Sequence, residues 1–349
     1  MKKFLKGLAV SLATVFCMAA FGCGQGTESS SASSQTEDEP VRLTAITGAD
    51  AVGSVQADYF LLAEPAVSAQ SKKGYSIAGD IQSLYGGENG YPQAVLVVKS
   101  SLAEEYYAWV KGFAEKLDGA AEWLKTATGE EIVQTVNAHM ADADTQSSLK
   151  APLLSTEAMG RCGVRYSWAQ ESRTEVESFL TQMRAVNENA AAIPAQAFYF
   201  DEAQEGAEVV PTRECTVYMP DGAPALAMAK LMKEDTADDG FTYKVVAPAM
   251  IASKVTNKDE SANADFCVLP VTAASKLLGS GEKYKMLGVV THGNLYLIAK
   301  DGTPLTAENI SHLQGKTVGV LQINEVPGLT LKTVLNKYGL SYQEITSIN

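Results

Sequence analysis

The stretch from Cys215 to Leu231 decides the fold of this chain: Cys-Thr-Val-Tyr-Met-Pro-Asp-Gly-Ala-Pro-Ala-Leu-Ala-Met-Ala-Lys-Leu. The β-branched and aromatic residues after Cys215 predict a short buried strand. Pro220-Asp221-Gly222 predicts a turn, and Pro224 followed by strong helix formers predicts a helix. In open α/β sheets, ligands bind where the N–H groups of such a helix start point. An ordinary βα unit without a ligand fits the same pattern.

The alternation of strand and helix continues on both sides of this stretch, which predicts a parallel α/β architecture. The other predicted strands are Val41–Ile46, Asp58–Ala63, Tyr75–Gly79, Gln93–Val98, Thr242–Val246, Phe266–Leu269, Met286–Val290, Asn294–Ala299, Lys316–Leu321 and Ser341–Ile345. The other predicted helices are Gly48–Val55, Ala66–Gln70, Leu102–Thr126, Glu130–Met140, Thr174–Asn187, Met250–Thr256, Ala273–Leu278, Ile310–Leu313 and Leu329–Tyr338. Leu84–Pro92 predicts a loop, Lys150–Gly163 a helix with a connection, and Ala190–Pro211 a linker.

The composition describes a globular, exported protein. The chain has 349 residues, of which 46% are hydrophobic and 20% charged, and its length is typical of two domains. Its formal net charge of −13 argues against nucleic acid or anionic lipid as a binding partner.

The first 40 residues predict a leader and a tether. Residues 1–22 have a basic start and an apolar run, as in a signal peptide. The sequence before Cys23 resembles a bacterial lipoprotein cleavage site, with Ala20 where a leucine is usual, and this predicts Cys23 as the lipidated residue. A plain secretory signal is the alternative. Residues 23–40 are rich in serine and acidic residues, which predicts a flexible tether.

Three cysteines remain after Cys17 and Cys23, namely Cys162, Cys215 and Cys267. Cys215 and Cys267 lie in predicted buried strands, so we expect buried free thiols. An exported protein is compatible with one disulfide, but the odd number gives no disulfide framework.

Several motifs together resemble one known family. They are Asp58-Tyr-Phe-Leu-Leu-Ala-Glu-Pro-Ala, Leu84-Tyr-Gly-Gly-Glu-Asn-Gly-Tyr-Pro-Gln-Ala, Asp221-Gly-Ala-Pro-Ala-Leu-Ala, Val268-Leu-Pro-Val-Thr-Ala-Ala-Ser-Lys-Leu-Leu-Gly, Gly315-Lys-Thr-Val-Gly-Val and Val326-Pro-Gly-Leu-Thr. The chain from Val41 to Asn349 resembles the solute-binding lipoproteins of ABC transporters, in the nitrate/sulfonate/taurine-type group.

The order of the segments differs from that family. There, the segment similar to Thr216–Ile345 comes first and the one similar to Val41–Asn189 follows; here they are exchanged. The chain therefore resembles a circular permutant, whether natural, engineered or an error in the gene record. This predicts that Ser341–Ile345 and Val41–Ile46 lie in one lobe, with Asn349 near residues 37–40.

The resemblance implies a periplasmic-binding-protein type II fold, with two lobes and a hinge of two strands, Gln93–Val98 and Asn294–Ala299. Each lobe would be a mostly parallel sheet flanked by helices. Residues 93–301, including the linker 190–211, would form one lobe, and residues 41–92 plus 302–349 the other. The implied protein is a monomeric, non-enzymatic binding protein held by lipid on the extracytoplasmic face of the cell membrane. It would close around a small organic solute and deliver it to an ABC permease and ATPase.

The ligand-binding candidates lie in turns at predicted strand ends. They are Glu64, Tyr85, Glu88, Asp221, Gly222, Ala223, Pro224, Pro270, Val271, Thr272, His292, Gly293, Asn324, Val326 and Pro327. Since these turns contain carboxylates but no lysine or arginine, we expect a neutral or cationic ligand, such as a nitrogen heterocycle. Helix capping and hinge ion pairs are alternative roles for the carboxylates.

Residues suited to catalysis or metal binding form no recognisable set. The three histidines, His139, His292 and His312, have no zinc-type spacing, and no Gly-x-Ser-x-Gly motif is present. We therefore predict no metal, no cofactor and no catalytic residue. The alternatives are an enzyme on the same fold acting on a heterocycle such as a thiamine-precursor pyrimidine, or a sensor subunit that docks on a receptor.

Overall fold

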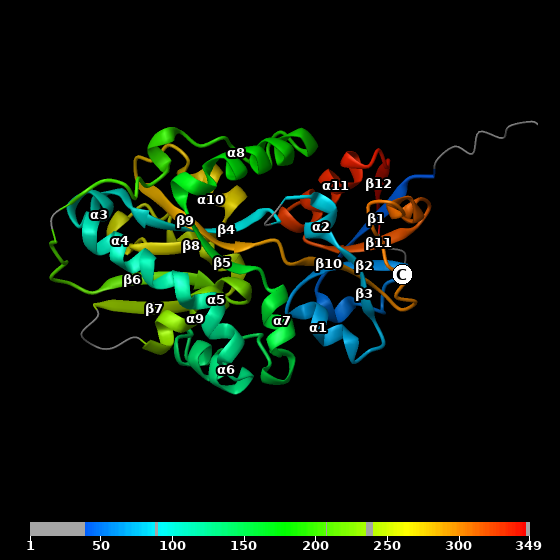
Figure 1. Ribbon diagram of the computed structural model, residues 1–349, viewed down its shortest axis with the longest axis horizontal. Helices are drawn as coiled ribbons and strands as arrows, with labels where there is room; N and C mark the ends of the chain where they lie inside the picture. Colours follow the sequence, from blue (N-terminus) through cyan, green and yellow to red (C-terminus); the bar gives the residue numbers. More distant parts are fainter. Residues whose placement is uncertain (1–38, 88–89, 207, 235–239, 347–349) are drawn as a thin grey trace, which may run out of the picture. The chain divides into compact units, whose positions relative to one another are not determined.

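Two six-stranded sheets organise the chain in the computed structural model, which describes residues 39–87, 90–206, 208–234 and 240–346 (Figure 1). Sheet A has the strand order β12-β1-β11-β2-β10-β3, and sheet B has the order β5-β9-β4-β8-β6-β7. Both sheets belong to one compact unit of the chain. The expected mixed α/β fold is therefore confirmed at this level.

Sheet A is assembled from both ends of the described chain. Its strands are β1 (Val41–Ile46), β2 (Tyr59–Ala63), β3 (Ser76–Asp80), β10 (Leu295–Ala299), β11 (Thr317–Leu321) and β12 (Tyr342–Ile345). β1 runs parallel to β11 on one side and to β12 on the other. The Val41 amide donates a hydrogen bond of 2.9 Å to the Ser341 carbonyl. The prediction that these two segments share a sheet is confirmed, whereas the expected position of Asn349 lies outside the described residues.

Sheet B contains only strands from the middle of the chain. They are β4 (Pro92–Lys99), β5 (Val164–Trp168), β6 (Cys215–Pro220), β7 (Phe241–Val246), β8 (Phe266–Pro270) and β9 (Tyr284–His292). β6, β7 and β8 are parallel, as the βα rhythm predicts, while β4 and β5 run in the opposite direction to them. Sheet A has one reversed strand, β10. Each sheet is therefore mixed. The expectation of a mostly parallel sheet is wrong for sheet B, where three of the five strand pairs are antiparallel.

The two strands expected to form a separate hinge are inner strands of the sheets. β4 lies between β9 and β8 in sheet B, and β10 lies between β2 and β3 in sheet A. The expected boundary at residue 301 places β10 in the same lobe as the strands of sheet B. In the structure β10 instead pairs with β2 and β3 of sheet A. The chain leaves sheet A between α2 and β4 and returns through Gly293-Asn294, so these short connections join the sheets.

Helices follow most strands, at the positions where apolar residues recur with helical spacing. The α-helices are α1 (Ala66–Ser71), α2 (Ile81–Tyr85), α3 (Ser100–Glu105), α4 (Tyr107–Glu115), α5 (Ala120–Thr126), α6 (Gly129–Ala138), α7 (Thr156–Arg161), α8 (Ala169–Val186), α9 (Ala223–Glu234), α10 (Val271–Leu278) and α11 (Val326–Lys337). The 3-10 helices are η1 (Ala49–Ala51), η2 (Lys116–Gly119), η3 (Ala151–Leu153), η4 (Gln196–Phe198), η5 (Pro248–Lys254), η6 (Glu260–Ala262) and η7 (Ile310–Leu313). Within the described ranges, no helix is both long and apolar enough to span a bilayer.

Local predictions differ from the structure in several places. The helix expected over Gly48–Val55 is only the short 3-10 helix η1. The helix expected over Leu102–Thr126 is divided into α3, α4, η2 and α5, because the backbone leaves the helical conformation at Tyr106 (φ −121°, ψ 43°). The helix expected after Met250 is the 3-10 helix η5. α2 extends into the expected loop at Leu84, where Asp80 caps it by accepting from two backbone amides. β5 was not predicted, since its half-buried residues lack a clear apolar pattern.

The described part of the segment 190–211 is irregular as expected, apart from η4, but it is packed against sheet B. Its aromatic residues Phe198, Tyr199 and Phe200 are buried, and the Phe200 amide bonds to the Met286 carbonyl. Cys162, Cys215 and Cys267 are buried free thiols, as expected. Burial raises the pKa of Cys215 to about 11, which keeps its thiol protonated near neutral pH.

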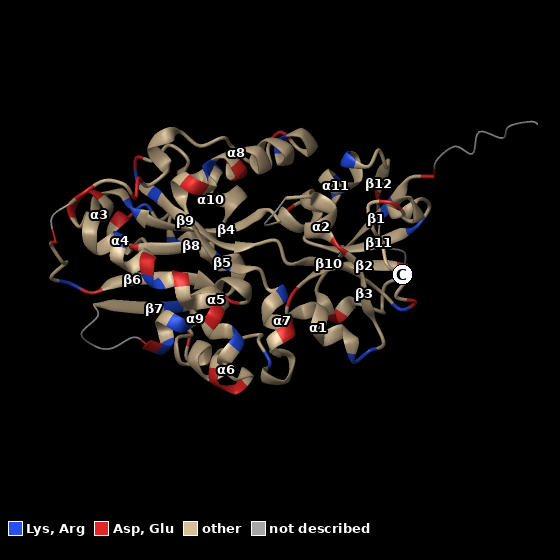
Figure 2. Cartoon of the chain, viewed as in Figure 1, with Lys and Arg blue, Asp and Glu red and all other residues tan. Residues whose placement is uncertain are grey.

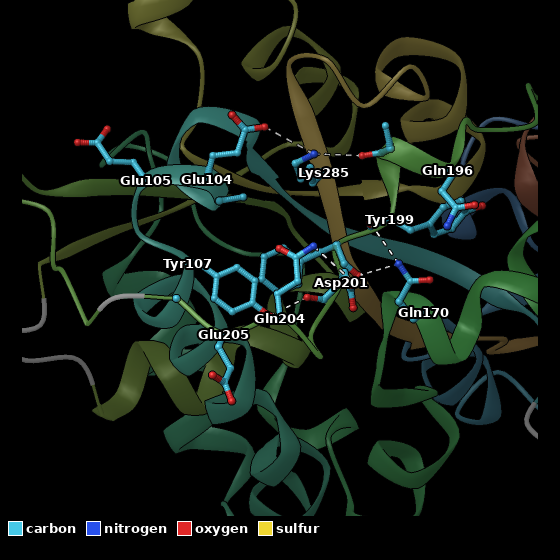
Figure 3. Close-up of a pocket in the computed structure, with 14 residues that line it drawn as sticks. Glu104, Glu105, Tyr107, Gln170, Gln196, Tyr199, Asp201, Gln204, Glu205 and Lys285 are labelled. Carbon is cyan, nitrogen blue, oxygen red and sulfur yellow. Dashed lines mark hydrogen bonds and ion pairs between the residues drawn. The ribbon is translucent and has the colours of Figure 1, made fainter.

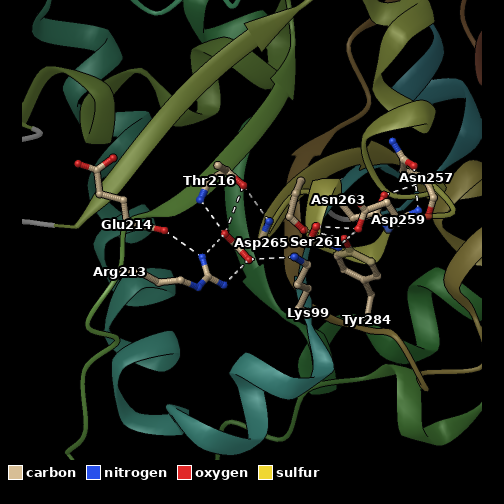
Figure 4. Close-up of polar contacts among 11 residues, drawn as sticks. Lys99, Arg213, Glu214, Thr216, Asn257, Asp259, Ser261, Asn263, Asp265 and Tyr284 are labelled. Atoms are coloured by element: carbon tan, nitrogen blue, oxygen red, sulfur yellow. Dashed lines mark hydrogen bonds and ion pairs between the residues drawn. The ribbon is translucent and has the colours of Figure 1, made fainter.

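The chain that follows this segment is fastened by Asp265, next to the start of β8 (Figure 4). Both carboxylate oxygens of Asp265 accept from the Arg213 guanidinium at 2.8 Å, and Lys99 lies 3.1 Å away. The Thr216 amide adds a bond of 2.9 Å. Asp265 thus ties the entry of β6 to β4 and β8.

Candidate functional site

The turn between β6 and α9 has the shape that the sequence predicts. Gly222 adopts φ +104°, a backbone conformation that residues with a Cβ rarely adopt, and this sharp turn begins at Asp221, directly after β6 ends at Pro220. Asp221 is half-buried, and its amide bonds to the Val246 carbonyl at the end of β7. The strand ends of β6 and β7 are therefore held together.

A cavity of about 1080 Å³ opens at these strand ends. We call residues 92–292, which contain all strands of sheet B, the sheet B region, and the rest of the described chain the sheet A region. Both regions line the cavity: Thr47 and Gly48 follow β1 of sheet A, and the other lining residues belong to the sheet B region. The other lining residues are Met140, Ala141, Asp142, Thr145, Gln146, Ser147, Ser148, Lys150, Asp221, Val245, Val246, Ala247, Pro248, Met250 and Lys254. We refer to this space as the strand-end cavity.

The carboxylate of Asp221 is oriented by the segment that follows α6. It accepts a hydrogen bond of 2.5 Å from the Ser147 hydroxyl and one of 2.7 Å from the Ser148 amide. The same segment is attached to sheet B, since the Ala141 amide bonds to the Val245 carbonyl. Asp221 is thus a fixed negative charge in the cavity wall.

Sequence reasoning missed the basic residues of this cavity. Lys150 and Lys254 line it, although neither lies in a turn at a strand end. The Lys254 ammonium lies 5.3 Å from the centre of the Tyr218 ring. The polar run 141–148 was a local signal for a loop, but only the pairing of Met140 with Val245 brings it to the cavity. A ligand preference inferred from carboxylates alone is therefore incomplete.

Glu64 lies outside the strand-end cavity, in a buried ion pair. Its carboxylate is 2.8 Å from Arg161 Nε and accepts two bonds of 3.0 Å from Ser68. Burial opposes the charge of Arg161, but the contacts with Glu64 and Glu157 outweigh it and raise the arginine pKa. Because Glu64 belongs to the sheet A region and Arg161 to α7, this pair joins the two sheet regions.

His292, Gly293 and Asn294 lie next to that ion pair, at the connection from β9 to β10. The Glu64 amide bonds to the Asn294 carbonyl at 3.0 Å, and the Asn294 side chain donates to the Glu64 carbonyl at 3.3 Å. His292 is 3% exposed, and burial with the nearby Arg165 charge lowers its pKa to about 3. Neither of its ring nitrogens makes a hydrogen bond of good geometry within the described residues. A Cβ on Gly293 would lie 2.6 Å from the Tyr91 ring, so the close packing requires glycine.

The remaining described candidates do not line the strand-end cavity. Tyr85 packs edge-on against Tyr91 and Phe179, and burial raises its pKa to about 12. The Asn324 side chain accepts from Lys332 at 3.4 Å. Glu88 lies outside the described residues. Ala223, Pro224, Pro270, Val271, Thr272, Val326 and Pro327 form helix starts or strand ends that do not line the strand-end cavity.

A second, smaller cavity of about 600 Å³ lies beside the segment 190–211 (Figure 3). Its polar groups are largely engaged, since Gln170 donates to the carbonyls of Tyr199 and Phe200, and Lys285 lies 3.7 Å from Glu104. All of its lining residues come from the sheet B region. The strand-end cavity is the stronger candidate, because both sheet regions contribute to it.

Neither the overall distribution of charged residues nor a metal-binding cluster distinguishes between the two cavities. Figure 2 shows most acidic and basic residues on helices and loops rather than on the strands. Among the described residues, no group of three or more His, Cys, Asp or Glu side chains could hold a metal ion.

A comparison with protein-family models, curated proteins and solved structures found no match to this chain.

Proposed function

We propose that this protein is an extracytoplasmic solute-binding lipoprotein that captures a small organic solute in the strand-end cavity. The observation that carries the proposal is the cavity itself, which combines Thr47 and Gly48 after β1 with the ends of β6 and β7. Ligand sites in α/β proteins lie at the carboxyl ends of parallel strands, and a site shared by two sheets can close when they approach.

The cavity has the size and the lining of a site for an organic molecule. Its volume of about 1080 Å³ is slightly above the usual range for ligand pockets, about 300–1,000 Å³. Apolar residues such as Val246 and Met250 line the cavity together with the polar residues Ser147, Ser148 and Asp221. This combination supports binding of an organic solute through both contact area and directed hydrogen bonds.

The remaining parts of the proposal rest on the sequence. The leader, Cys23 and the tether support lipid attachment outside the cytoplasm, and residues 1–38 of these segments lie outside the described residues. The family resemblance supports delivery of the solute to an ABC permease and ATPase. It also supports a two-lobed binding-protein fold with the two sheets as the lobes, closing at the connection Gly293-Asn294.

Gly48 offers a direct test of the cavity. Its backbone is extended (φ −177°) and a Cβ there would meet no atom within 4 Å, so a larger side chain can be introduced at this lining position without a clash at its Cβ. A thermal-shift screen with sulfonates, amines, amino acids, peptides and pyrimidines should identify one stabilising class. We expect Gly48→Leu to keep the melting temperature of the free protein and to lose at least about tenfold in ligand affinity.

Gly112→Leu is the matched control. Gly112 also has open space around its Cβ position, but it lies in α4, away from the cavity. This variant should bind the ligand as the unmodified protein does. Equal binding by Gly48→Leu and Gly112→Leu would place the ligand elsewhere, and the absence of any stabilising class would refute solute binding.

A further inference from the structure

The charged residues of the strand-end cavity occur in two opposite pairs. Asp142 and Asp221 are acidic, and Lys150 and Lys254 are basic. Among the described residues, none of these four side chains forms an ion pair with another charged group. The cavity therefore presents both signs of charge without cancelling them internally.

The immediate partners of these groups are neutral. Asp221 accepts from Ser147 and Ser148, and Lys254 faces the Tyr218 ring at 5.3 Å. The Lys150 ammonium lies 3.5 Å from the Ser147 carbonyl. A neutral hydrogen-bond partner or an aromatic ring orients a charged group but does not neutralise it. Asp221, Lys150 and Lys254 can therefore each still bind a ligand group of opposite charge.

The space near these charges has an apolar surface. Met250 is 50% exposed, although it is a large apolar side chain, and it lines the cavity with Val246 and Pro248. An exposed apolar side chain inside a cavity gains contact area when an apolar group covers it. The cavity thus has two kinds of charged contact and an apolar surface.

We propose that the solute is a zwitterion with an apolar body, as in an apolar amino acid or short peptide with free ends. Its ammonium group would meet Asp221 and its carboxylate would meet Lys150 and Lys254. A ligand with one charge would leave the opposite pair uncompensated, whereas a zwitterion complements both pairs. The cavity volume of about 1080 Å³ exceeds the needs of a single amino acid and favours a dipeptide-sized body. This inference rests on the proposed function.

Four probes separate the contributions of the two charged ends. Leucine and leucyl-leucine are zwitterions, N-acetyl-leucyl-leucine keeps only the carboxylate, and leucyl-leucine amide keeps only the ammonium group. We expect calorimetry with the full protein to show that leucyl-leucine binds at least about tenfold more tightly than either capped form, since one charged hydrogen bond is lost in each.

Variants assign each end of the ligand. Asp221→Asn should weaken leucyl-leucine about tenfold and leave N-acetyl-leucyl-leucine unchanged, because the acetylated probe has no ammonium group. Lys254→Gln should weaken leucyl-leucine but not its amide. The controls Asp144→Asn and Lys258→Gln change exposed residues outside the cavity and should have no effect.

The outcomes distinguish this inference from the proposed function. Equal or tighter binding of a capped probe overturns the zwitterion, as does a screen in which another ligand class alone binds. If that ligand is sensitive to Gly48→Leu, the proposed function still holds. If no compound in the screen binds, both proposals fail.

Discussion

Asp265 shows how one buried carboxylate holds a long irregular segment in place. Its side chain is 4% exposed and accepts from Arg213, Lys99 and Thr216. Burial alone would raise its pKa, but these donors and positive charges outweigh it and lower the pKa from 3.8 to about 2. The ionised carboxylate is therefore the form that the fold stabilises.

We expect Asp265→Asn to destabilise the protein by about 1–3 kcal/mol, because Arg213 and Lys99 lose their counter-charge. Chemical denaturation near pH 7 measures the effect. The matched control is Asp259→Asn, since Asp259 is exposed and an asparagine can also accept from the Ser261 amide. A loss no larger than that of the control would show that the Asp265 contacts contribute little.

The same site predicts the direction of the pH dependence. A lowered pKa in the folded state adds stability above pH 3.8, where the unfolded carboxyl is ionised. This contribution declines as the pH falls from about 4 to about 2. The difference in unfolding free energy between the native protein and Asp265→Asn should therefore shrink over that range.

Among the elements, β11 and β12 decide whether sheet A can form. β11 lies between β1 and β2, and β12 covers the outer edge of β1. The β12 contacts include an ion pair of 2.7 Å between Lys332 and Glu344. Because β11 is an inner strand and β12 an outer one, their removal should have unequal effects.

Two truncations test this arrangement. Ending the chain after Gln314 removes β11, α11 and β12, and we expect β2 to lose amide protection, with unfolding of sheet A. Ending it after Leu340 removes only β12 and should cost much less, with β2 still protected. Hydrogen exchange at Phe60–Leu62 measures both. Full protection of β2 in the shorter protein would contradict the observed strand order.

At the level of the whole molecule, Cys23 determines the expected location. If it is the lipidated first residue of the mature protein, two acyl chains give stable membrane attachment where a single chain would not. We expect Cys23→Ser to release the protein from the membrane fraction, with Cys162→Ser as the control that keeps it there. Membrane retention of Cys23→Ser would instead indicate an uncleaved leader.

The order of the segments also matters for the whole molecule. The pairing of β1 with β11 and β12 lets sheet A form from segments separated by more than 200 residues. A circularly permuted chain, as we propose from the family resemblance, would keep its contacts but change the order in which they are connected. The long sequence separation predicts slow assembly of sheet A compared with sheet B.

Local sequence patterns predicted most of the elements and one wall of the site. Buried apolar runs predicted most strands, and Pro220-Asp221-Gly222 predicted the turn that places Asp221 at the end of β6. These features depend on neighbours along the chain, such as side-chain branching, turn residues and helix starts. They could therefore be predicted without a partner segment.

The rest of the site depends on contacts between distant segments, which the structure alone reveals. Lys150 and Lys254 join Asp221 in one cavity, while Glu64 is taken into an ion pair with Arg161. Strand pairing and the docking of residues 141–148 on β7 decide these positions, and both join segments far apart in the chain. Contacts of this kind depend on the packing of whole elements, which local sequence patterns do not specify.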